Sequence, residues 1–401
     1  MRLTGGVRDG GADEAAWGGV TAVRPLAWER QDLGRRLVAW SGLGAPIPLG
    51  VAATVGRLGA VQLDPMQVVA PAHLWTLSLR RGPTTAGALD RALGRGELVE
   101  AICGVRALVH VEDAAALVGG WRRRRARNLA AVYAVDDAAR RVMALAESGE
   151  PFTARSLEGG ERVTGFWEPV GVRTTKATSV AVDLLWAEGR LAVVGRRGGQ
   201  KLYRLMESHL PRVAALVADL SVEEAAALAV RHSLRTWGVL WTAQPLGWGA
   251  CEGATGRREW LERAGEEGWA VPLTLAGAGR SGGGPRPWAA AALLEGDTPR
   301  AARAALLAPL DNVLWNRDRL ETLFAFRYRW EAYVPAAKRR ASAYNMPVLT
   351  GARFWGEADA RWREGRFEAA LRGADGQAVP LAVESAVARA ARLAERLRGR
   401  P

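Results

Sequence analysis

The chain has 401 residues, enough for about two to three domains of roughly 150 residues each. Apolar residues make up 49% of it and charged residues 24%, which is the balance of a folded protein and excludes a disordered one. No apolar run approaches the roughly 20 residues that a membrane-spanning helix needs, so we expect no membrane contact. The first 24 residues lack the apolar stretch of a signal peptide, and the cytoplasm is the expected compartment.

Cysteine and histidine are too sparse for a metal centre. The two cysteines, Cys103 and Cys251, cannot form a disulfide framework or a four-thiolate site. Four histidines are spread along the chain without an HxxxH or HxH spacing: His73, His110, His209 and His232. We expect no metal ion, no iron–sulfur cluster and no other cofactor.

The charge balance favours an anionic partner. The 55 basic and 42 acidic residues give a net charge of +13, and only Lys176, Lys201 and Lys338 are lysines. Lysine and arginine bind phosphates and release counterions, so this balance is typical of a protein that binds nucleic acid. A basic protein that binds no polyanion, with an arginine content set by GC-rich coding, explains the composition equally well.

The predicted elements begin with two helices. Residues 1–24 mix glycine with both charge signs and predict a disordered tail. Apolar residues then recur at helical spacing from Trp28 to Leu43, and Gly42 is placed to end that helix. A second short helix is expected over Pro48–Leu58.

A helix, a glycine and an apolar strand then follow one another three times, spaced roughly 80–90 residues apart. The three copies are Leu89–Ile102 (LDRALGRGELVEAI), Val182–Arg197 (VDLLWAEGRLAVVGRR) and Trp260–Leu273 (WLERAGEEGWAVPL). Gly96, Gly189 and Gly268 each stand where a helix needs a left-handed residue after its last turn, and β-forming residues come next. A helical unit before a β-hairpin is typical of a winged helix-turn-helix, so the pattern predicts three in tandem. Ordinary α/β connections are the alternative, although long parallel-strand runs are missing.

The C-terminal part is expected to be β-rich. The segment Gly277–Trp288 (GAGRSGGGPRPW) predicts a flexible loop or linker. Strand-like segments follow at Phe324–Glu331, Pro347–Trp355 and Arg361–Leu371, and a basic amphipathic helix at Ala382–Arg398 closes the chain. The fold class is therefore mainly α with small β elements. The expected divisions are a tail (1–24), three winged helices (25–120, 121–210 and 211–276), the loop (277–288), and a β-rich domain with the terminal helix (289–401).

The sharpest chemical signal is the stretch Val61–Pro65 (VQLDP). Strand alternation puts its two apolar residues on one side. Gln62 and Asp64 then share the other side, so an amide and a carboxylate face the same way. Pro65 suits the first turn of a helix, which makes Asp64 the N-cap. A carboxylate beside an amide could also stabilise a cation or orient a water molecule, and the spacing leaves both interpretations open.

Three stretches resemble the winged-helix DNA glycosylases of the AlkZ/YcaQ type, over most of residues 28–371. They are Leu58–Arg80 (LGAVQLDPMQVVAPAHLWTLSLR), with the family's Gln-x-Asp signature at Gln62 and Asp64; the region of Lys176, its wing and Lys201–Leu205 (KLYRL); and Leu306–Arg340 (LLAPLDNVLWNRDRLETLFAFRYRWEAYVPAAKRR). The resemblance implies three tandem winged helix-turn-helix domains that form a concave DNA-binding surface, with a C-terminal β-barrel-like module. It also implies hydrolysis of the N-glycosidic bond of alkylated purines, and unhooking of interstrand crosslinks in some members.

Two stretches depart from the family pattern. Glu100–Gly104 (EAICG) replaces an aromatic-rich Glu-Tyr-Trp-x-His stretch. Ser342 and Ala343 replace the Gly and first Tyr of a Gly-Tyr-Tyr-x-x-Pro stretch, before Tyr344 and Pro347. Both changes shrink side chains, which predicts a wider site. Since relatives protect antibiotic producers from their own DNA-alkylating products, we expect a bulky guanine N7 adduct as the substrate, in DNA repair or self-resistance.

The chemistry of such a substrate agrees with these roles. Alkylation at guanine N7 or adenine N3 makes the base a cationic, good leaving group, and the sugar then develops oxocarbenium character. Asp64 would stabilise this cation and position or deprotonate water, and Gln62 would hold the water or the sugar–phosphate. Three lysines leave few amines for a lyase step, so we expect a monofunctional hydrolase.

His73 and the basic residues complete the candidate sites. His73 lies in an apolar helical stretch, where packing and an active-site role both fit. The DNA-binding candidates are Arg122, Arg123, Arg124, Arg125, Lys176, Arg196, Arg197, Lys338 and Arg339. The densest run, Trp121–Asn128 (WRRRRARN), suits either phosphate contact or a solvated helix face. The 17 tryptophans are spread throughout, so most are expected in cores or interfaces.

Three classes of function remain. The leading prediction is a DNA glycosylase acting on alkylated purines in double-stranded DNA, a monomer in the cytoplasm associated with the nucleoid. The others are a non-enzymatic winged-helix DNA-binding protein or transcriptional regulator, and a structural scaffold. The Gln62/Asp64 pair separates the first from the second, because a regulator does not need it. Salt-sensitive DNA binding separates both from the third.

Overall fold

The structure, a computed structural model, describes residues 25–64, 66–133, 135–157, 160–164, 172, 174–241, 253–276, 286–332, 334–339, 342–373 and 378–398. The expected disordered tail (1–24) and most of the expected loop (277–288) lie outside these residues. The end of that loop was wrongly placed, because Pro287 and Trp288 begin strand β11 (Pro287–Ala290). The described residues form helices and small sheets, in agreement with the predicted fold class.

The first helix–hairpin unit carries the Gln62/Asp64 stretch. Its helices are α2 (Val51–Leu58), α3 (Ala72–Arg81) and α4 (Ala86–Gly94), and its strands are β2 (Val61–Gln62), β3 (Leu98–Cys103) and β4 (Val105–His110). The sheet is antiparallel with strand order β2-β4-β3, so β2 is an edge strand. A 3-10 helix, η1 (Val111–Leu117), leads out of this unit.

The second unit repeats the helix–hairpin pattern. It consists of α5 (Val118–Tyr133), α6 (Asp136–Glu147), η2 (Ala154–Ser156), β5 (Arg162–Val163), β6 (Thr175–Lys176), α7 (Ala177–Ala187), β7 (Leu191–Arg197), β8 (Gln200–Leu205), α8 (Met206–His209) and α9 (Pro211–Asp219). Between α7 and β7 the backbone approaches the ring of Trp121, and a Cβ at Gly189 would lie 2.5 Å from its Cδ2. Glycine is required at this turn for space as well as for its φ of +73°.

The third unit combines segments that are far apart in the sequence. It consists of α10 (Val222–Trp237), β9 (Val239–Trp241), α11 (Gly253–Glu266), β10 (Ala270–Leu275), β11 and α12 (Ala291–Leu294). β1 (Leu26–Trp28) adds to β10 as a parallel strand. The first predicted helix is α1 (Arg30–Trp40), and its Leu33 and Leu37 enter the same core. The sequence-based division assigns β1 and α1 to the first unit, because they are adjacent to it along the chain. No local pattern in the sequence indicates that they pair with the third unit.

The three repeated glycines have the predicted left-handed conformation. The φ angle is +70° at Gly96, +73° at Gly189 and +80° at Gly268. Each glycine follows the end of a helix and precedes a strand. This part of the repeat is confirmed, while the number of winged helices and their boundaries stay predictions.

The C-terminal part is a curled, half-barrel sheet with one long helix against it. Its antiparallel strands run in the order β12 (Ala305–Leu306), β13 (Asn345–Thr350), β14 (Arg353–Arg363) and β15 (Arg366–Gly373). The predicted terminal helix is α14 (Leu381–Arg398), which packs its alanines into the core under this sheet. Between β12 and β13 the chain forms η3 (Asn312–Leu314), α13 (Arg317–Phe324) and η4 (Ala336–Lys338).

The strand predicted over Phe324–Glu331 is wrong. Its first residue ends α13, and the rest have no regular structure. The aromatic residues pack without strand pairing, since Phe326 stacks on Phe354 with ring centroids 4.5 Å apart. Alternating aromatic residues therefore satisfied the strand pattern without forming a strand. The segments Pro347–Trp355 and Arg361–Leu371 are β-structured, but each spans parts of two strands.

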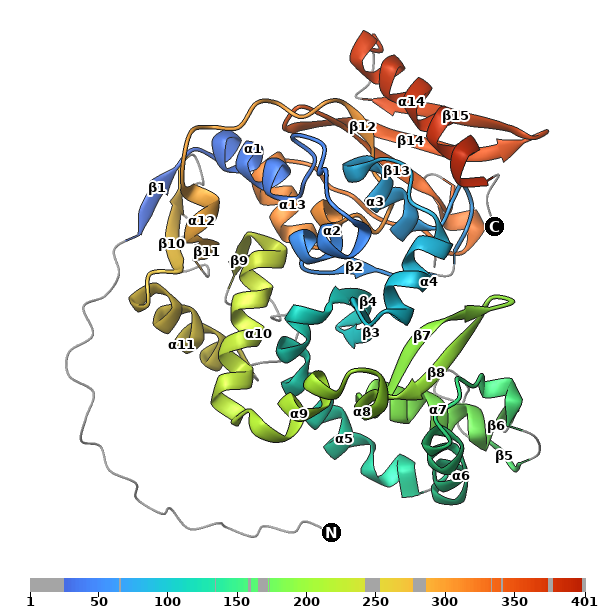
Figure 1. Cartoon of the computed structure of the whole chain (residues 1–401). Helices are drawn as coiled ribbons and strands as arrows, with labels where there is room; N and C mark the ends of the chain where they lie inside the picture. The colour runs from blue at the N-terminus through green and yellow to red at the C-terminus, as the bar shows by residue number, and fades with distance from the viewer. Residues whose placement is uncertain are drawn as a thin grey trace, which may run out of the picture.

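Figure 1 shows the C-terminal sheet and α14 at one end of the molecule, and α5, α6 and the β7–β8 hairpin at the other. The β2-β4-β3 sheet lies between these ends. β3 contacts β7 of the second unit, while α10 of the third unit contacts η1 and η3. The short strand β2 therefore lies where the separate parts of the chain meet.

Candidate active site

Gln62 and Asp64 lie where β2 leaves its sheet. Gln62 pairs with Ala107 of β4, and the Leu63 N–H donates to the Arg106 carbonyl oxygen at 2.8 Å. β2 is two residues long and is paired on one side only. Such a strand depends on its surroundings for its position.

Side chains alternate along this stretch as the sequence predicts. Val61 and Leu63 are 1% and 7% exposed, and both belong to the core that the first and second units share. Gln62 and Asp64 are half-buried and lie outside that core. The amide and the carboxylate are therefore more exposed than the two apolar side chains that alternate with them.

Asp64 closes a turn and does not cap a helix. Its Oδ1 accepts the Met66 backbone N–H at 2.7 Å, which is the arrangement of an Asx-turn. Residues 66–71 are not helical and α3 starts at Ala72, so the helix predicted from Pro65 is wrong. An aspartate that bonds to nearby backbone suits a turn as well as a cap. The second carboxylate oxygen, Oδ2, has no hydrogen-bond partner in the described part of the chain.

Tyr344 is the aromatic neighbour of Asp64. Its phenol is 2% exposed, and its hydroxyl donates to the Ala70 carbonyl oxygen at 3.4 Å. Burial raises the pKa of Tyr344, and the charge of Asp64 raises it further. Tyr344 is therefore a neutral hydrogen-bond donor close enough to the carboxylate to sense its charge.

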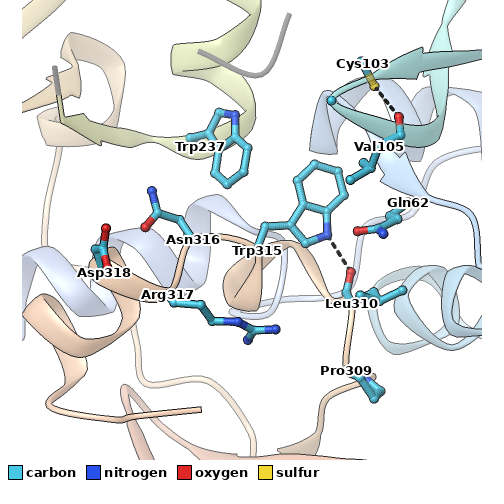
Figure 2. A pocket seen from close by; sticks show the side chains of 11 residues that line it. Gln62, Cys103, Val105, Trp237, Pro309, Leu310, Trp315, Asn316, Arg317 and Asp318 are labelled. Atoms are coloured by element: carbon cyan, nitrogen blue, oxygen red, sulfur yellow. Dashed lines mark hydrogen bonds between the residues drawn. The ribbon is translucent and has the colours of Figure 1, made fainter. Parts of the chain in front are cut away.

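A pocket of about 420 Å³ opens beside Gln62 (Figure 2). It is formed where the β3–β4 turn, the end of α10 and the chain leading into α13 meet. Its lining consists of Gln62, residues 103–105, Trp237, and residues 309–310 and 315–318. Of the site residues predicted from the sequence, Gln62 lines this pocket, and Asp64 lies two positions further along the chain without lining it.

Two indole rings form the aromatic wall of the pocket. The rings of Trp237 and Trp315 meet edge to face, with centroids 5.4 Å apart and planes at 62°. The Trp315 indole N–H donates to the Leu310 carbonyl oxygen at 2.7 Å, which fixes the ring. Figure 2 shows Trp315 between Trp237 and Gln62. Indole faces of this kind stack on flat ligands.

The β3–β4 turn lines the pocket with small side chains. Cys103 and Gly104 belong to the stretch where the sequence predicts a widened site. Burial raises the pKa of the Cys103 thiol to about 12, so the thiol stays protonated and is not a nucleophile. Within the described residues, no group of three His, Cys, Asp or Glu side chains is placed to hold a metal ion.

Arg317 and Asp318 are the charged residues of the lining. The Arg317 Cζ lies 4.3 Å from the centroid of the Tyr328 ring, and burial lowers the pKa of this guanidinium. Figure 2 shows Arg317 extended beneath Trp315, while Asp318 points away from it. The pocket thus combines an aromatic wall, an amide and a cation.

Comparison with known proteins identifies the family. The model of the family described as DNA glycosylase AlkZ-like matches residues 55–396, which include β2, the whole pocket lining and the C-terminal sheet. The chain belongs to the AlkZ-like DNA glycosylase family. The solved structure of the Streptomyces sahachiroi DNA glycosylase AlkZ is similar in fold, with a TM-score of 0.60 and 16% sequence identity. The alignment covers 94% of this chain and 98% of that one.

Family membership confirms the resemblance found in the sequence. The leading class, a DNA glycosylase with DNA as its substrate, is the class that the comparison supports. No helix among the described residues of this glycosylase is long and apolar enough to cross a membrane.

His73 of the glycosylase does not line the pocket. It is the second residue of α3, and its Nδ1 is buried without a hydrogen-bond partner among the residues described. Burial lowers the pKa of His73 to about 4, and the charge of Arg196 adds to this effect. His73 is therefore neutral at pH 7. This placement agrees with the packing interpretation, and an active-site role stays a prediction.

Glu100, Arg196 and Lys201 form an ion-pair cluster between the first and second units. The buried Glu100 carboxylate lies 2.5 Å from the Arg196 guanidinium and 2.9 Å from the Lys201 ammonium. Burial would raise the pKa of Glu100, but the two cations outweigh it and lower the pKa. Arg196 also lies 3.2 Å from the Asp90 carboxylate. Arg196, a predicted DNA contact, thus has two partners within the protein.

The predicted DNA-binding arginines of α5 differ in their exposure. Arg122 donates to two carbonyl oxygens at the end of α9, at 2.6 and 2.5 Å. Arg123 and Arg124 are half-buried, and burial lowers the pKa of Arg124. Arg125 is exposed. The helix therefore offers part of its arginine run to a ligand and uses another part to hold α9.

The remaining DNA-binding candidates differ in exposure. Arg197 at the end of β7, Lys176 before α7 and Lys338 in η4 are exposed. Arg339 is half-buried, and its Nε donates to the Val334 carbonyl oxygen at 2.7 Å. DNA contact by all of these residues stays a prediction.

Sequence reasoning did not find the aromatic wall of the pocket. Trp237 and Trp315 are two of 17 tryptophans, and nothing local distinguishes them from core residues. Trp315 and Arg317 lie within Leu306–Arg340, and the resemblance of this stretch to the family was the one indication that they belong to the site. Trp237 belongs to another unit and reaches the pocket only through the fold.

Proposed function

We propose that this glycosylase hydrolyses the N-glycosidic bond of alkylated purines, including bulky or crosslinked N7-alkylguanine. The observation that carries the proposal is the Gln62/Asp64 pair. Gln62 lines a pocket that has an aromatic wall. One carboxylate oxygen of Asp64 accepts no hydrogen bond from the described residues. Enzymes that act on a base turn it out of the duplex, and this pocket offers it a place.

The proposed chemistry assigns separate roles to the two side chains. An N7-alkylated guanine already carries positive charge and leaves without an acid to protonate it. The sugar that remains develops oxocarbenium character, which the Asp64 carboxylate would stabilise. Asp64 would also position or deprotonate the attacking water, and Gln62 would hold that water or the sugar–phosphate. One carboxylate and one amide are then sufficient.

The pocket suits a flat base with a large substituent. Its volume of about 420 Å³ falls within the range of about 300–1,000 Å³ that is typical for drug-sized ligands. The indole rings of Trp237 and Trp315 offer a stacking surface to a flat base. The small residues Cys103 and Gly104 leave room for a substituent on N7.

Hydrolysis without a lyase step is proposed from the positions of the lysines. A lyase needs a nucleophilic amine at the sugar, and no lysine is among the described residues that line the pocket. Lys201 is paired with Glu100, and its Nζ lies 3.7 Å from the centroid of the Trp186 ring. Lys176 and Lys338 lie outside the pocket lining.

We propose that the three helix–hairpin units act as tandem winged helices on DNA. The net charge of +13 favours binding to phosphates. Arg125, Lys176, Arg197 and Lys338 are the exposed members of the predicted set and are the best placed to contact the backbone. The biological role would be DNA repair, or self-resistance to a DNA-alkylating antibiotic.

The proposed function is tested by excision from synthetic DNA. One duplex carries a single N7-methylguanine, a second carries a bulky N7 adduct or a defined crosslink, and a third is undamaged. Heat or alkali then cuts each strand at its abasic sites, and the fragments are measured on a denaturing gel. Excision from the two damaged duplexes alone is expected, with the bulky adduct preferred if the role is self-resistance. Binding without excision would favour the regulator instead.

A further inference from the structure

The chain just before Gln62 is held by side chains from distant parts of the sequence. Asn312 donates its Nδ2 hydrogens to the carbonyl oxygens of Leu58 and Ala60, at 3.3 and 2.8 Å. His232 places its Nε2 2.9 Å from the carbonyl oxygen of Gly59, between them. Three successive carbonyls before β2 therefore accept hydrogen bonds from η3 and from α10 of the third unit.

Both donors are buried, and so are the residues whose carbonyl oxygens they contact. Asn312 and His232 are each 4% exposed. Burial lowers the pKa of His232 to about 3, which keeps its ring neutral and able to donate from Nε2 to the carbonyl. Leaving a buried carbonyl without its donor is costly, so loss of either side chain should shift the backbone it holds.

The third unit also packs closely against the backbone at Gly59. Gly59 has a φ of +77°, and a Cβ there would lie 2.1 Å from the Thr236 Oγ1 of α10. Thr236 is one turn beyond His232 on the same helix, and its Oγ1 donates to the His232 carbonyl oxygen at 2.8 Å. One face of α10 thus determines where the chain enters β2.

A buried arginine connects this holding point to the wall of the pocket. Arg319 donates to the carbonyl oxygens of Asn312 and Val313 at 3.0 and 3.3 Å, and it also donates to the Trp237 carbonyl oxygen. Its guanidinium is fully buried, and its Cζ lies 5.5 Å from the centroid of the Trp237 ring. Asn312 and the aromatic wall therefore share one rigid support.

We propose that Asn312 and His232 are positioning residues, which hold Gln62 and Asp64 at a fixed place relative to the Trp237 wall. β2 has two residues and a partner on one side only, so its own pairing does not fix it. A catalytic group displaced by about 1 Å can lose about a hundredfold in rate. The inference rests on the proposed function, because Gln62 and Asp64 matter here as the groups that act on the sugar.

The test separates excision from binding. Asn312→Ala and His232→Leu remove the donors, and each should slow single-turnover excision at saturating enzyme by about tenfold or more, since misplacement acts on the chemical step. DNA affinity should stay within about twofold of the parent, because the contacts lie away from exposed phosphate-binding groups. His232→Gln places an amide N–H near the position of Nε2 and should recover most of the rate.

Arg36→Ala is the matched control. Arg36 is also a buried side chain that donates to three backbone carbonyls, those of Leu293, Glu295 and Gly296, but it lies in the third unit away from β2. It should lower the melting temperature to a similar extent without slowing excision. Equal slowing in Arg36→Ala and Asn312→Ala would overturn the proposal, because the effect would then be general destabilisation.

A second measurement does not depend on catalysis. Hydrogen exchange of the backbone amides in residues 58–64 should speed up in Asn312→Ala and His232→Leu, and stay unchanged in Arg36→Ala. If the parent excises damaged bases while these variants match it in both rate and exchange, the positioning role is wrong and the proposed function stands. If the parent excises nothing, the proposed function fails, and the exchange data alone decide whether the two side chains hold this segment.

Discussion

The guanidinium of Arg80 and the carboxylate of Asp311 form a two-pronged ion pair, with both nitrogen–oxygen distances at 2.8 Å and both side chains fully buried. Arg80 also donates to the carbonyl oxygens of Ser41 and Thr76, at 2.6 and 2.9 Å. The pair joins α3, which follows the Gln62/Asp64 stretch, to the segment that carries Asn312. The pair therefore fixes α3 to the segment that carries Asn312 and leads into the pocket lining.

Removing one member of this pair should destabilise the protein strongly. Asp311→Ala leaves the Arg80 guanidinium buried without its anion, which typically costs about 3–5 kcal/mol of the free energy of unfolding. Chemical denaturation monitored by tryptophan fluorescence measures this loss. Glu321→Ala, which breaks an exposed pair with Arg327, is the control and should cost less than about 1 kcal/mol. A similar loss in both variants would contradict the assigned role of burial.

Two histidines with lowered pKa values, His232 and His73, should make the protein less stable in acid. Burial, as the largest cause, lowers the pKa from 6.5 to about 3 at His232 and to about 4 at His73. Unfolded histidine binds a proton near pH 6.5 while the folded one does not, so unfolding takes up protons. The two histidines do not lower the free energy of unfolding above about pH 6.5. Below that pH, protonation of the unfolded chain lowers the free energy of unfolding by up to about 1.4 kcal/mol per histidine and pH unit, down to about pH 4.

Melting temperatures recorded across this pH range check the sign. The parent should melt at progressively lower temperature as the pH falls below about 6.5, where unfolded histidine becomes protonated. His232→Gln should show a shallower decline, because glutamine takes up no proton on unfolding. A variant with the slope of the parent would mean that His232 does not contribute to the acid lability.

Local sequence signals predicted local structure well. Gly96, Gly189 and Gly268 were found because a left-handed residue after a helix has few alternatives to glycine. Alternation in Val61–Asp64 was found because a strand repeats every two residues. The helix cap predicted at Asp64 was wrong, because the carboxylate closes a turn at Met66 and α3 starts only at Ala72.

The sequence failed where a residue's surroundings come from distant chain. The N-terminal strand Leu26–Trp28 pairs with β10, and no local pattern reports that pairing. Arg196 was predicted to contact DNA, but it pairs with two carboxylates, Asp90 and Glu100, that belong to the first unit. Trp237 reaches the pocket only because α10 ends there. Burial and ion pairing are properties of the assembled fold, so a single sequence cannot supply them.

DNA affinity should fall steeply with salt, and exposure should decide which arginines matter. Each phosphate contact contributes about 0.9 to the slope of log affinity against log salt concentration. Arg125→Ala and Arg197→Ala should each flatten the slope by about one contact, whereas Arg122→Ala, which loses bonds to α9, should lower stability and keep the slope. Fluorescence anisotropy with a labelled duplex measures all three. Affinity that is indifferent to salt would argue against phosphate-dominated binding.

The product of the reaction should be an intact abasic strand. No lysine is among the described residues that line the pocket, so no Schiff base with the sugar is expected. Incubation of enzyme and damaged duplex with borohydride, followed by denaturing electrophoresis, should show no covalent protein–DNA band. Strand breaks should appear only after added heat or alkali. A trapped adduct would instead point to Lys176, Lys201, Lys338 or the N-terminal amine.

Asp64→Asn should separate catalysis from local structure. Asparagine keeps an oxygen that accepts the Met66 N–H, so the turn survives and folding should lose at most about 1 kcal/mol. The substitution removes the charge that would face the developing sugar cation, and loss of such an electrostatic contribution typically slows a reaction about a hundredfold or more. Gln62→Ala should slow excision less, because solvent can partly replace an amide that places water.

Single-turnover excision, measured together with a melting curve for each protein, decides between the two roles of Asp64. If Asp64→Asn excises at the parental rate, or loses activity only because it unfolds, then Asp64 is a turn residue. The catalytic carboxylate would in that case lie elsewhere.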